Sequence, residues 1–262
     1  MNRPLRDSFD AAPVNSIPVS KDGFTRPDGR PPRNRPLMRK YEVAYLGPNS
    51  DGLDFTRIAP ALPDFESAFA GFARGTLIGT PDGLCAVEDL QPGMKVSTQD
   101  MGPQTLLWKG AITLLPDVPG QAPEMGKLVR VSADTFGPSR PMPDLMLGAA
   151  ARLFDQSPLT RSHIGALGSF VPVRNRIDGD MVIEITPVAP VRIFHLGFLS
   201  HHRINANGLD VESYHPGSRE DFALSGELEK LFLSLFPHVN SLRDFGAMLA
   251  PRVPLDSWEA VA

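Results

Sequence analysis

The sequence has one cysteine, two tryptophans and three tyrosines among its 262 residues, and its net charge is only −4. A single cysteine, Cys85, excludes an intrachain disulfide and any metal site built from several thiolates. The small net charge gives no global field toward nucleic acid. No apolar run reaches the roughly 18 residues of a membrane-spanning helix.

The N-terminus has no apolar signal core, which predicts a cytoplasmic protein, although export by a route without a cleaved signal stays open. Turn-forming residues, by contrast, are abundant, with 23 glycines and 27 prolines. They favour many short strands over long helices. Four segments are predicted: a basic Pro-rich arm over 1–40, a hairpin with a short helix over 41–74, a mainly β domain over 75–217 and a helical appendage over 218–262.

The arm carries nine Lys and Arg against four Asp and has almost no periodic hydrophobicity, so it is predicted to be disordered. Contact with nucleic acid or an anionic surface is the alternative to a solvated tail. After the arm, alternation over 41–45 and 53–58 predicts a β-hairpin. A short helix follows, with Asp64 as N-cap and Phe65, Phe69 and Phe72 on one side.

The central part of the chain is predicted to contain strands at 104–115, 127–131, 144–147, 170–173 and 181–186, with a mobile loop at 159–169. Trp108 is expected in the core, and Cys85 as a small buried side chain. Asn207-Gly208 is a two-residue hairpin signal, because both residues tolerate positive φ. Beyond Gly217, an apolar stripe predicts a helix that ends before Pro237, and Asn240 is a candidate cap for a second one.

Three separated blocks carry a resemblance to a known family. They are Gly75-Thr76-Leu77-Ile78-Gly79-Thr80 with Val87-Glu88-Asp89-Leu90, then Asp144 to Arg152, and finally His202-Arg203-Ile204-Asn205-Ala206-Asn207-Gly208. Together they resemble the Hint superfamily, the self-cleaving domains of hedgehog proteins and inteins, and especially its bacterial variants. The resemblance implies a horseshoe or disc of curled antiparallel strands.

The resemblance also implies where the self-cleaving groups would stand. The nucleophile that attacks the preceding carbonyl falls on Gly71, which has no side chain. The Ser or Thr and the His of the next motif fall on Gly148 and Ala151. The family's aspartate before the final loop falls on His195, and its terminal His-Asn falls on Glu212-Ser213. Of these family residues only the histidine before Asn-Gly is kept, as His202.

The sequence therefore predicts a Hint-like protein without autoprocessing, with no catalytic residue, cofactor or metal ligand set, that acts as a scaffold or interaction module. Residual self-processing is one alternative. Another is an enzyme that reuses the late histidines, His195, His201, His202 and His215, as a hydrolase or metal site. A third is binding through the flanks: Leu231, Phe232, Leu235 and Phe236 would cover either a protein partner or the chain's own sheet.

Overall fold

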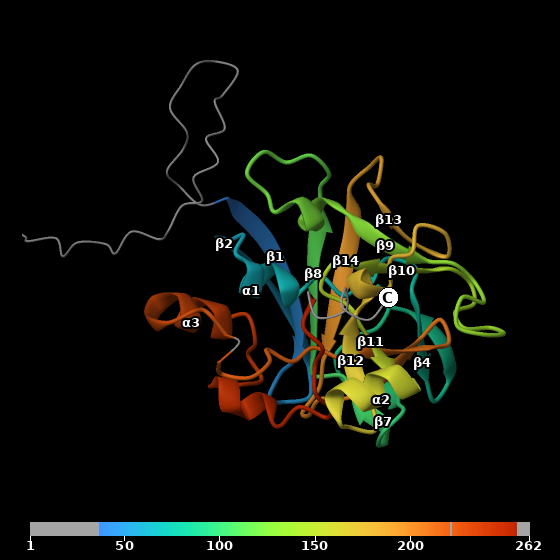
Figure 1. Cartoon of the computed structure of the whole chain (residues 1–262). Coiled ribbons are helices and arrows are strands. Elements are labelled where there is room, and N and C mark those ends of the chain that lie inside the picture. Colours follow the sequence, from blue (N-terminus) through green and yellow to red (C-terminus); the bar gives the residue numbers. More distant parts are fainter. Residues whose placement is uncertain (1–36, 221, 256–262) are drawn as a thin grey trace, which may run out of the picture. The chain divides into compact units, whose positions relative to one another are not determined.

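The computed structural model describes residues 37–220 and 222–255. The arm through residue 36 lies outside the described residues, and with it the predictions of disorder and of contact with an anionic partner. The described residues from Leu37 onward form one compact unit, built mainly from antiparallel strands in two sheets (Figure 1). Met38 to Lys40, predicted as the end of the arm, belong to the first strand.

The first sheet has eight strands in the order β13-β9-β10-β3-β14-β8-β1-β2. Their bounds are β1 Met38–Leu46, β2 Gly52–Pro60, β3 Phe72–Ala73, β8 Trp108–Leu114, β9 Leu128–Val131, β10 Leu145–Gly148, β13 Val182–Ile185 and β14 Val191–Gly197. The predicted hairpin is confirmed, with Met38 opposite Pro60 and Leu46 opposite Gly52. Since β1 also pairs with β8, the hairpin is part of this sheet.

The second sheet runs β12-β11-β16-β15-β4-β5, with β6 on β15 and β7 on β6. Its bounds are β4 Leu77–Thr80, β5 Gly83–Ala86, β6 Lys95–Thr98, β7 Gly102–Thr105, β11 Arg152–Asp155, β12 Ser169–Pro172, β15 Arg203–Ala206 and β16 Leu209–Glu212. The β15–β16 hairpin confirms the Asn207-Gly208 prediction, because their φ values are 48° and 90°.

The described helices are short. They are α1 Pro63–Ser67, α2 Pro158–Ile164 and α3 Gly226–Leu233, with 3₁₀ turns η1 Pro123–Gly126, η2 Val173–Arg176 and η3 Leu242–Phe245. None of them is long and apolar enough to cross a membrane.

The first predicted helix is shorter than expected. It ends at Ser67, and its N-cap is Leu62 rather than Asp64. Phe72, predicted on the helix, lies instead in β3, opposite Leu147 and Phe194. Because β3 pairs with β10 on one side and β14 on the other, backbone groups at Phe72 form hydrogen bonds between strands instead of extending the helix.

The predicted loop at 159–169 was wrong, because α2 occupies most of it. The Ser157 side chain accepts from the Thr160 N–H at its start, and Gly165 ends it at φ 68°. Two further predictions need correction. The turn near 242 is capped by Ser241 rather than Asn240, and Cys85 is only partly buried against the core.

The helical appendage packs into the chain's own core. Phe232, Leu235 and Phe236 are fully buried. Trp108, also fully buried as predicted, stacks on Phe236 with ring centroids 4.7 Å apart and donates its indole N–H to the Leu235 carbonyl. This part of the apolar stripe therefore covers the sheet rather than a free surface.

Candidate functional site

The Ala70–Gly71 peptide lies between α1 and β3, and Gly71 is the position that the resemblance predicts for the nucleophile. The Gly148 N–H donates to the Gly71 carbonyl at 2.7 Å, and the Ala150 N–H donates to the Ala70 carbonyl at 3.1 Å. The loop after β10 thus holds both carbonyls through backbone groups alone.

Gly71 has no room for a side chain. A Cβ atom there would lie 1.9 Å from Cδ2 of His195 and 2.8 Å from the Phe194 carbonyl oxygen. Both distances are far shorter than an ordinary van der Waals contact. The imidazole of His195 therefore fills the space that a nucleophilic side chain at position 71 would need.

Gly148 is closed off in a similar way. A Cβ atom there would lie 2.5 Å from the Ala70 carbonyl oxygen, which is backbone and cannot swing aside. Ser or Thr at this position would need the Ala70–Gly71 peptide to move. Glycine is therefore required at both positions, because neighbouring groups approach the backbone too closely for a side chain.

Ala151 and Ser213 are both buried. Ala151 is buried in the second apolar cluster, together with Phe72 and Leu147. The Ser213 hydroxyl is buried and accepts the His202 N–H at 2.9 Å. Its hydroxyl therefore completes a backbone hydrogen bond.

His202 has a structural partner that the sequence did not reveal. Its Nδ1 lies 2.7 Å from a carboxylate oxygen of Asp100, whose other oxygen accepts the Arg203 N–H at 2.9 Å. The imidazole is 2% exposed. The pair ties the turn after β6 to the start of β15.

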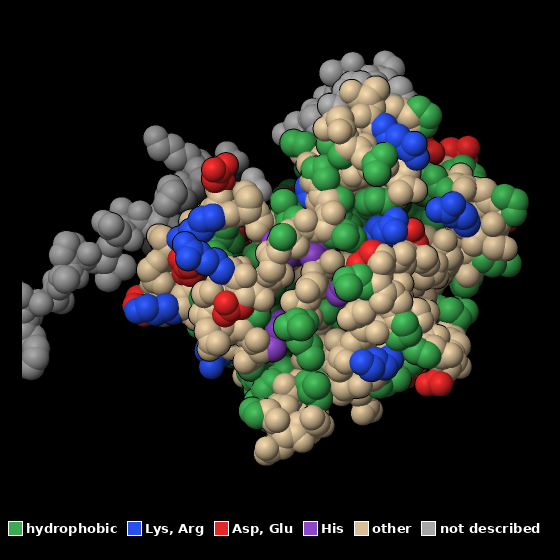
Figure 2. All heavy atoms as spheres, turned by 90° about the horizontal axis from the view of Figure 1, so that it is seen from below, with side chains coloured by type: hydrophobic (Ala, Val, Ile, Leu, Met, Phe, Trp, Pro, Cys, Tyr) green, Lys and Arg blue, Asp and Glu red, His purple; other side chains and the backbone are tan. Residues whose placement is uncertain are grey.

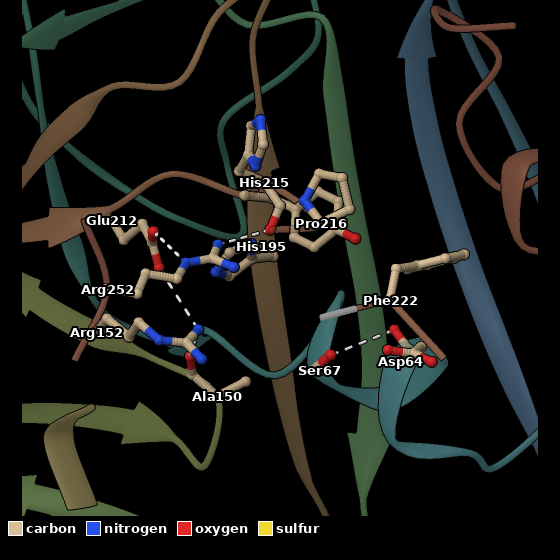
Figure 3. A pocket seen from close by; sticks show the side chains of 11 residues that line it. Asp64, Ser67, Ala150, Arg152, His195, Glu212, His215, Pro216, Phe222 and Arg252 are labelled. Carbon is tan, nitrogen blue, oxygen red and sulfur yellow. Dashed lines mark hydrogen bonds and ion pairs between the residues drawn. The ribbon is translucent and has the colours of Figure 1, made fainter. Parts of the chain in front are cut away.

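A polar pocket of about 150 Å³ lies beside these positions. Figure 3 shows Arg152, Glu212 and Arg252 on one side and Asp64 with Ser67 on the other. The residues lining it are Asp64, Ser67, Ala150, Arg152, His195, Glu212, Tyr214, His215, Pro216, Phe222 and Arg252. Of the predicted positions, His195 and Glu212 line the pocket directly, and Ala151 and Ser213 are chain neighbours of lining residues.

Glu212 is the most deeply buried carboxylate of the pocket, with its side chain 3% exposed. Arg252 Nε donates to it at 2.8 Å, His201 Nε2 lies 3.0 Å away, and Arg152 lies at 3.6 Å. Burial opposes its ionisation, but the neighbouring guanidinium of Arg252 and the contact with His201 outweigh burial and lower the pKa to about 2. The carboxylate is therefore charged throughout the physiological range.

The pocket histidines are held neutral. Burial, with little compensation from Glu212, lowers the pKa of His195 to about 3. Burial and the neighbouring His201 lower the pKa of His215 to about 4. His195 is buried, but its Nδ1 has no hydrogen-bond partner. It therefore lacks the orienting carboxylate of a catalytic His–Asp pair.

Acidification is expected to destabilise the protein from about pH 6.5 downward. Because the folded-state pKa of His195 and His215 is depressed, the unfolded chain takes up protons first, and stability is lost as the pH falls. Each histidine lowers the free energy of unfolding by up to about 1.4 kcal/mol per pH unit.

Urea unfolding at pH values from about 7.5 to 4.5 measures how steeply the free energy of unfolding depends on pH. The variant His215→Gln should show a weaker dependence. A free energy of unfolding that does not change with pH above about pH 5 would contradict the prediction.

Several residues of the pocket, among them Arg152, Arg252 and Ser67, were given no site role from the sequence. Arg152 was noted only as part of a motif, Arg252 lies far beyond the β domain, and Ser67 precedes it. The i, i+4 and capping rules do not predict such long-range pairs.

Among the described residues, no group of three or more potential ligands is arranged to hold a metal ion. On the face in Figure 2, Lys and Arg side chains are scattered among acidic and apolar ones.

The comparisons with known proteins agree with this architecture. The family model described as Hint domain matches residues 70–218. Among solved structures, the chain is similar to the solution structure of a bacterial intein-like domain from Clostridium thermocellum, with 12% identity and a TM-score of 0.36 over 55% of this chain and 99% of that one. That likeness is too distant to carry an argument. No curated protein matches the chain.

Proposed function

Since the chain belongs to the Hint domain family, which matches more than half of it, we propose that it is a member that does not cut its own backbone. Self-cleavage needs a nucleophile next to the attacked carbonyl. The observation that carries the proposal is the contact between Gly71 and His195, where a Cβ atom would lie 1.9 Å from the imidazole. A nucleophile is missing, and the space it would need is taken.

The neighbouring positions support the same proposal. Ala151 supplies no general acid, and Gly148 cannot gain a Cβ atom without moving the Ala70 carbonyl. In cooperating catalytic groups, loss of one member removes most of the rate, so several losses leave little activity. What persists is the backbone framework that holds the Ala70–Gly71 peptide.

The function proposed for this framework is that of a scaffold or interaction module, since fold alone does not determine activity. Incubating the purified full chain with a thiol for a day and following its mass tests the first half. The mass is expected to stay constant, and fragments that break near Gly71 or Ser213 would contradict it. Affinity capture from the native cell with a chemical cross-linker tests the second half.

A further inference from the structure

The C-terminal segment, defined as residues 246–254, pairs with the outer edge of the second sheet through Pro251 to Val253. The Phe170 N–H of β12 donates to the Pro251 carbonyl at 2.9 Å, and the Val253 N–H donates to the Phe170 carbonyl at 2.9 Å. These two bonds bracket Arg252 in a parallel bridge. Because β12 is the end strand of its sheet, the segment occupies a backbone edge that other chains use for strand addition.

Arg252 projects from this segment into the polar pocket. Its Nε donates to Glu212 at 2.8 Å, and its terminal nitrogen donates to the His215 carbonyl at 2.7 Å (Figure 3). The two acceptors lie at different corners of one planar guanidinium. A lysine, with a single point charge, could not reproduce both bonds in this geometry.

Further polar contacts involve the backbone of the segment. The Leu249 N–H donates to Nδ1 of His201 at 3.1 Å, and Nε2 of His215 donates to the Gly246 carbonyl at 3.2 Å. The Leu249 side chain is 41% exposed, whereas Val253 is 3% exposed. The contacts thus involve the backbone of Pro251 to Val253, one arginine and one buried valine, which are features that a different sequence can also supply.

We propose that the edge of β12 and the Glu212 carboxylate form a site for an extended peptide segment of a partner protein that carries Arg followed by a small β-branched residue. The C-terminal segment is then the resident ligand, bound in cis. This inference rests on the proposed function as an interaction module and names the chemistry of its partner. Pro251 and Pro254 suit the resident ligand, since proline presets an extended backbone.

A partner protein is favoured over a second copy of the chain, because the two differ in the free energy gained when they displace the resident segment. The segment of a second copy would make the same contacts as the resident one, so an exchange gains nothing and loses the advantage of the covalent tether. A partner segment with further contacts can displace it. Arg252→Ala in the full chain removes the side-chain anchor of the resident segment and leaves Glu212 open to an arginine supplied in trans.

A fluorescent peptide with the sequence of residues 250–255, Ala-Pro-Arg-Val-Pro-Leu, tests the proposal by anisotropy. It is expected to bind Arg252→Ala at least about 10-fold more tightly than the wild-type chain, since two charge-assisted bonds are gained only when the pocket is vacant. The same peptide with Lys in place of Arg should bind at least about 10-fold more weakly. Adding Glu212→Gln to Arg252→Ala should abolish the difference between the two peptides.

A second full-length variant, Val253→Ser, guards against misfolding of the first, because it loosens the resident segment while leaving the charges in place. It too should bind the peptide more tightly than wild type. No binding to either folded variant, or equal binding of the Lys peptide, would overturn the proposal. So would a wild-type dimer that the peptide dissociates, which would assign the site to a second copy. The intact mass of the same samples reports separately on self-cleavage.

Discussion

Replacing Gly71 with alanine is expected to lower the free energy of unfolding by about 1–3 kcal/mol, the cost of forcing an extra group into a packed site. The added methyl would meet Cδ2 of His195 at 1.9 Å and the Phe194 carbonyl at 2.8 Å. The imidazole is 5% exposed and contacts the rings of Phe72 and Tyr214, so moving it aside would disturb both contacts. Urea unfolding followed by circular dichroism measures the loss.

Two further variants make this test specific. Gly52→Ala, at a strand glycine with nothing within 4 Å of its Cβ position, should change stability by less than about 0.5 kcal/mol. His195→Ala should recover part of the loss when it is combined with Gly71→Ala, because the two residues compete for one space. Strictly additive effects of the two substitutions would show that they do not compete.

Replacing Glu212 with glutamine is expected to cost about 3–5 kcal/mol, because it breaks the ion pairs of a buried carboxylate and leaves two partly buried guanidinium groups without their partner. Arg252 and His201 both lie within 3.0 Å of this carboxylate, whose side chain is 3% exposed. The pKa of Glu212, lowered to about 2, means that the charged form is the one that stabilises the fold. Its contribution is therefore retained down to about pH 4.5 and lost below it.

The matched control is Glu227→Gln, which removes an exposed partner of Lys230. The two side chains are 88% and 74% exposed, and such pairs are worth about 0–1 kcal/mol. Thermal unfolding of both variants in low and high salt separates the cases. A loss of less than about 1 kcal/mol for Glu212→Gln would contradict a structural role for the buried cluster.

The fold could be predicted in large part because its signals are local. The hairpin of β1 and β2 and the tight turn at Asn207-Gly208 follow from alternation and from positive φ, which depend on neighbouring residues only. The burial of Trp108 follows from its size. Local rules were weakest where long-range pairing decides the outcome, as for Phe72, which β10 and β14 draw into a strand.

The helix α2 is a different kind of error, since its signals were present. Ser157 before Pro158 and Gly165 at the other end are ordinary start and stop residues. Few apolar residues lie between Ser157 and Gly165, so the segment has no clear amphipathic pattern and was interpreted as a loop. These two signals by themselves predict a helix between them.

The candidate site was only half predictable. Aligning motifs could identify Gly71, Gly148 and Ala151 as positions without reactive groups, because the framework around them is recognisable. The occupation of that space by His195, and the arrival of Arg252 from beyond the β domain, depend on tertiary contacts that no spacing rule encodes. The missing side chains are visible in the sequence, whereas the close approach of His195 to Gly71 and the ion pair of Arg252 are visible only in the structure.

The intact mass of the full chain, taken directly after purification and again after prolonged incubation with hydroxylamine, tests the central claim most directly. Hydroxylamine traps any ester or thioester at the Ala70–Gly71 junction as a cut chain. The predicted result is one species at 28.5 kDa at both times. A fragment that begins at Gly71 would contradict the account, since it would mean that the chain cuts its own backbone although position 71 carries no nucleophilic side chain.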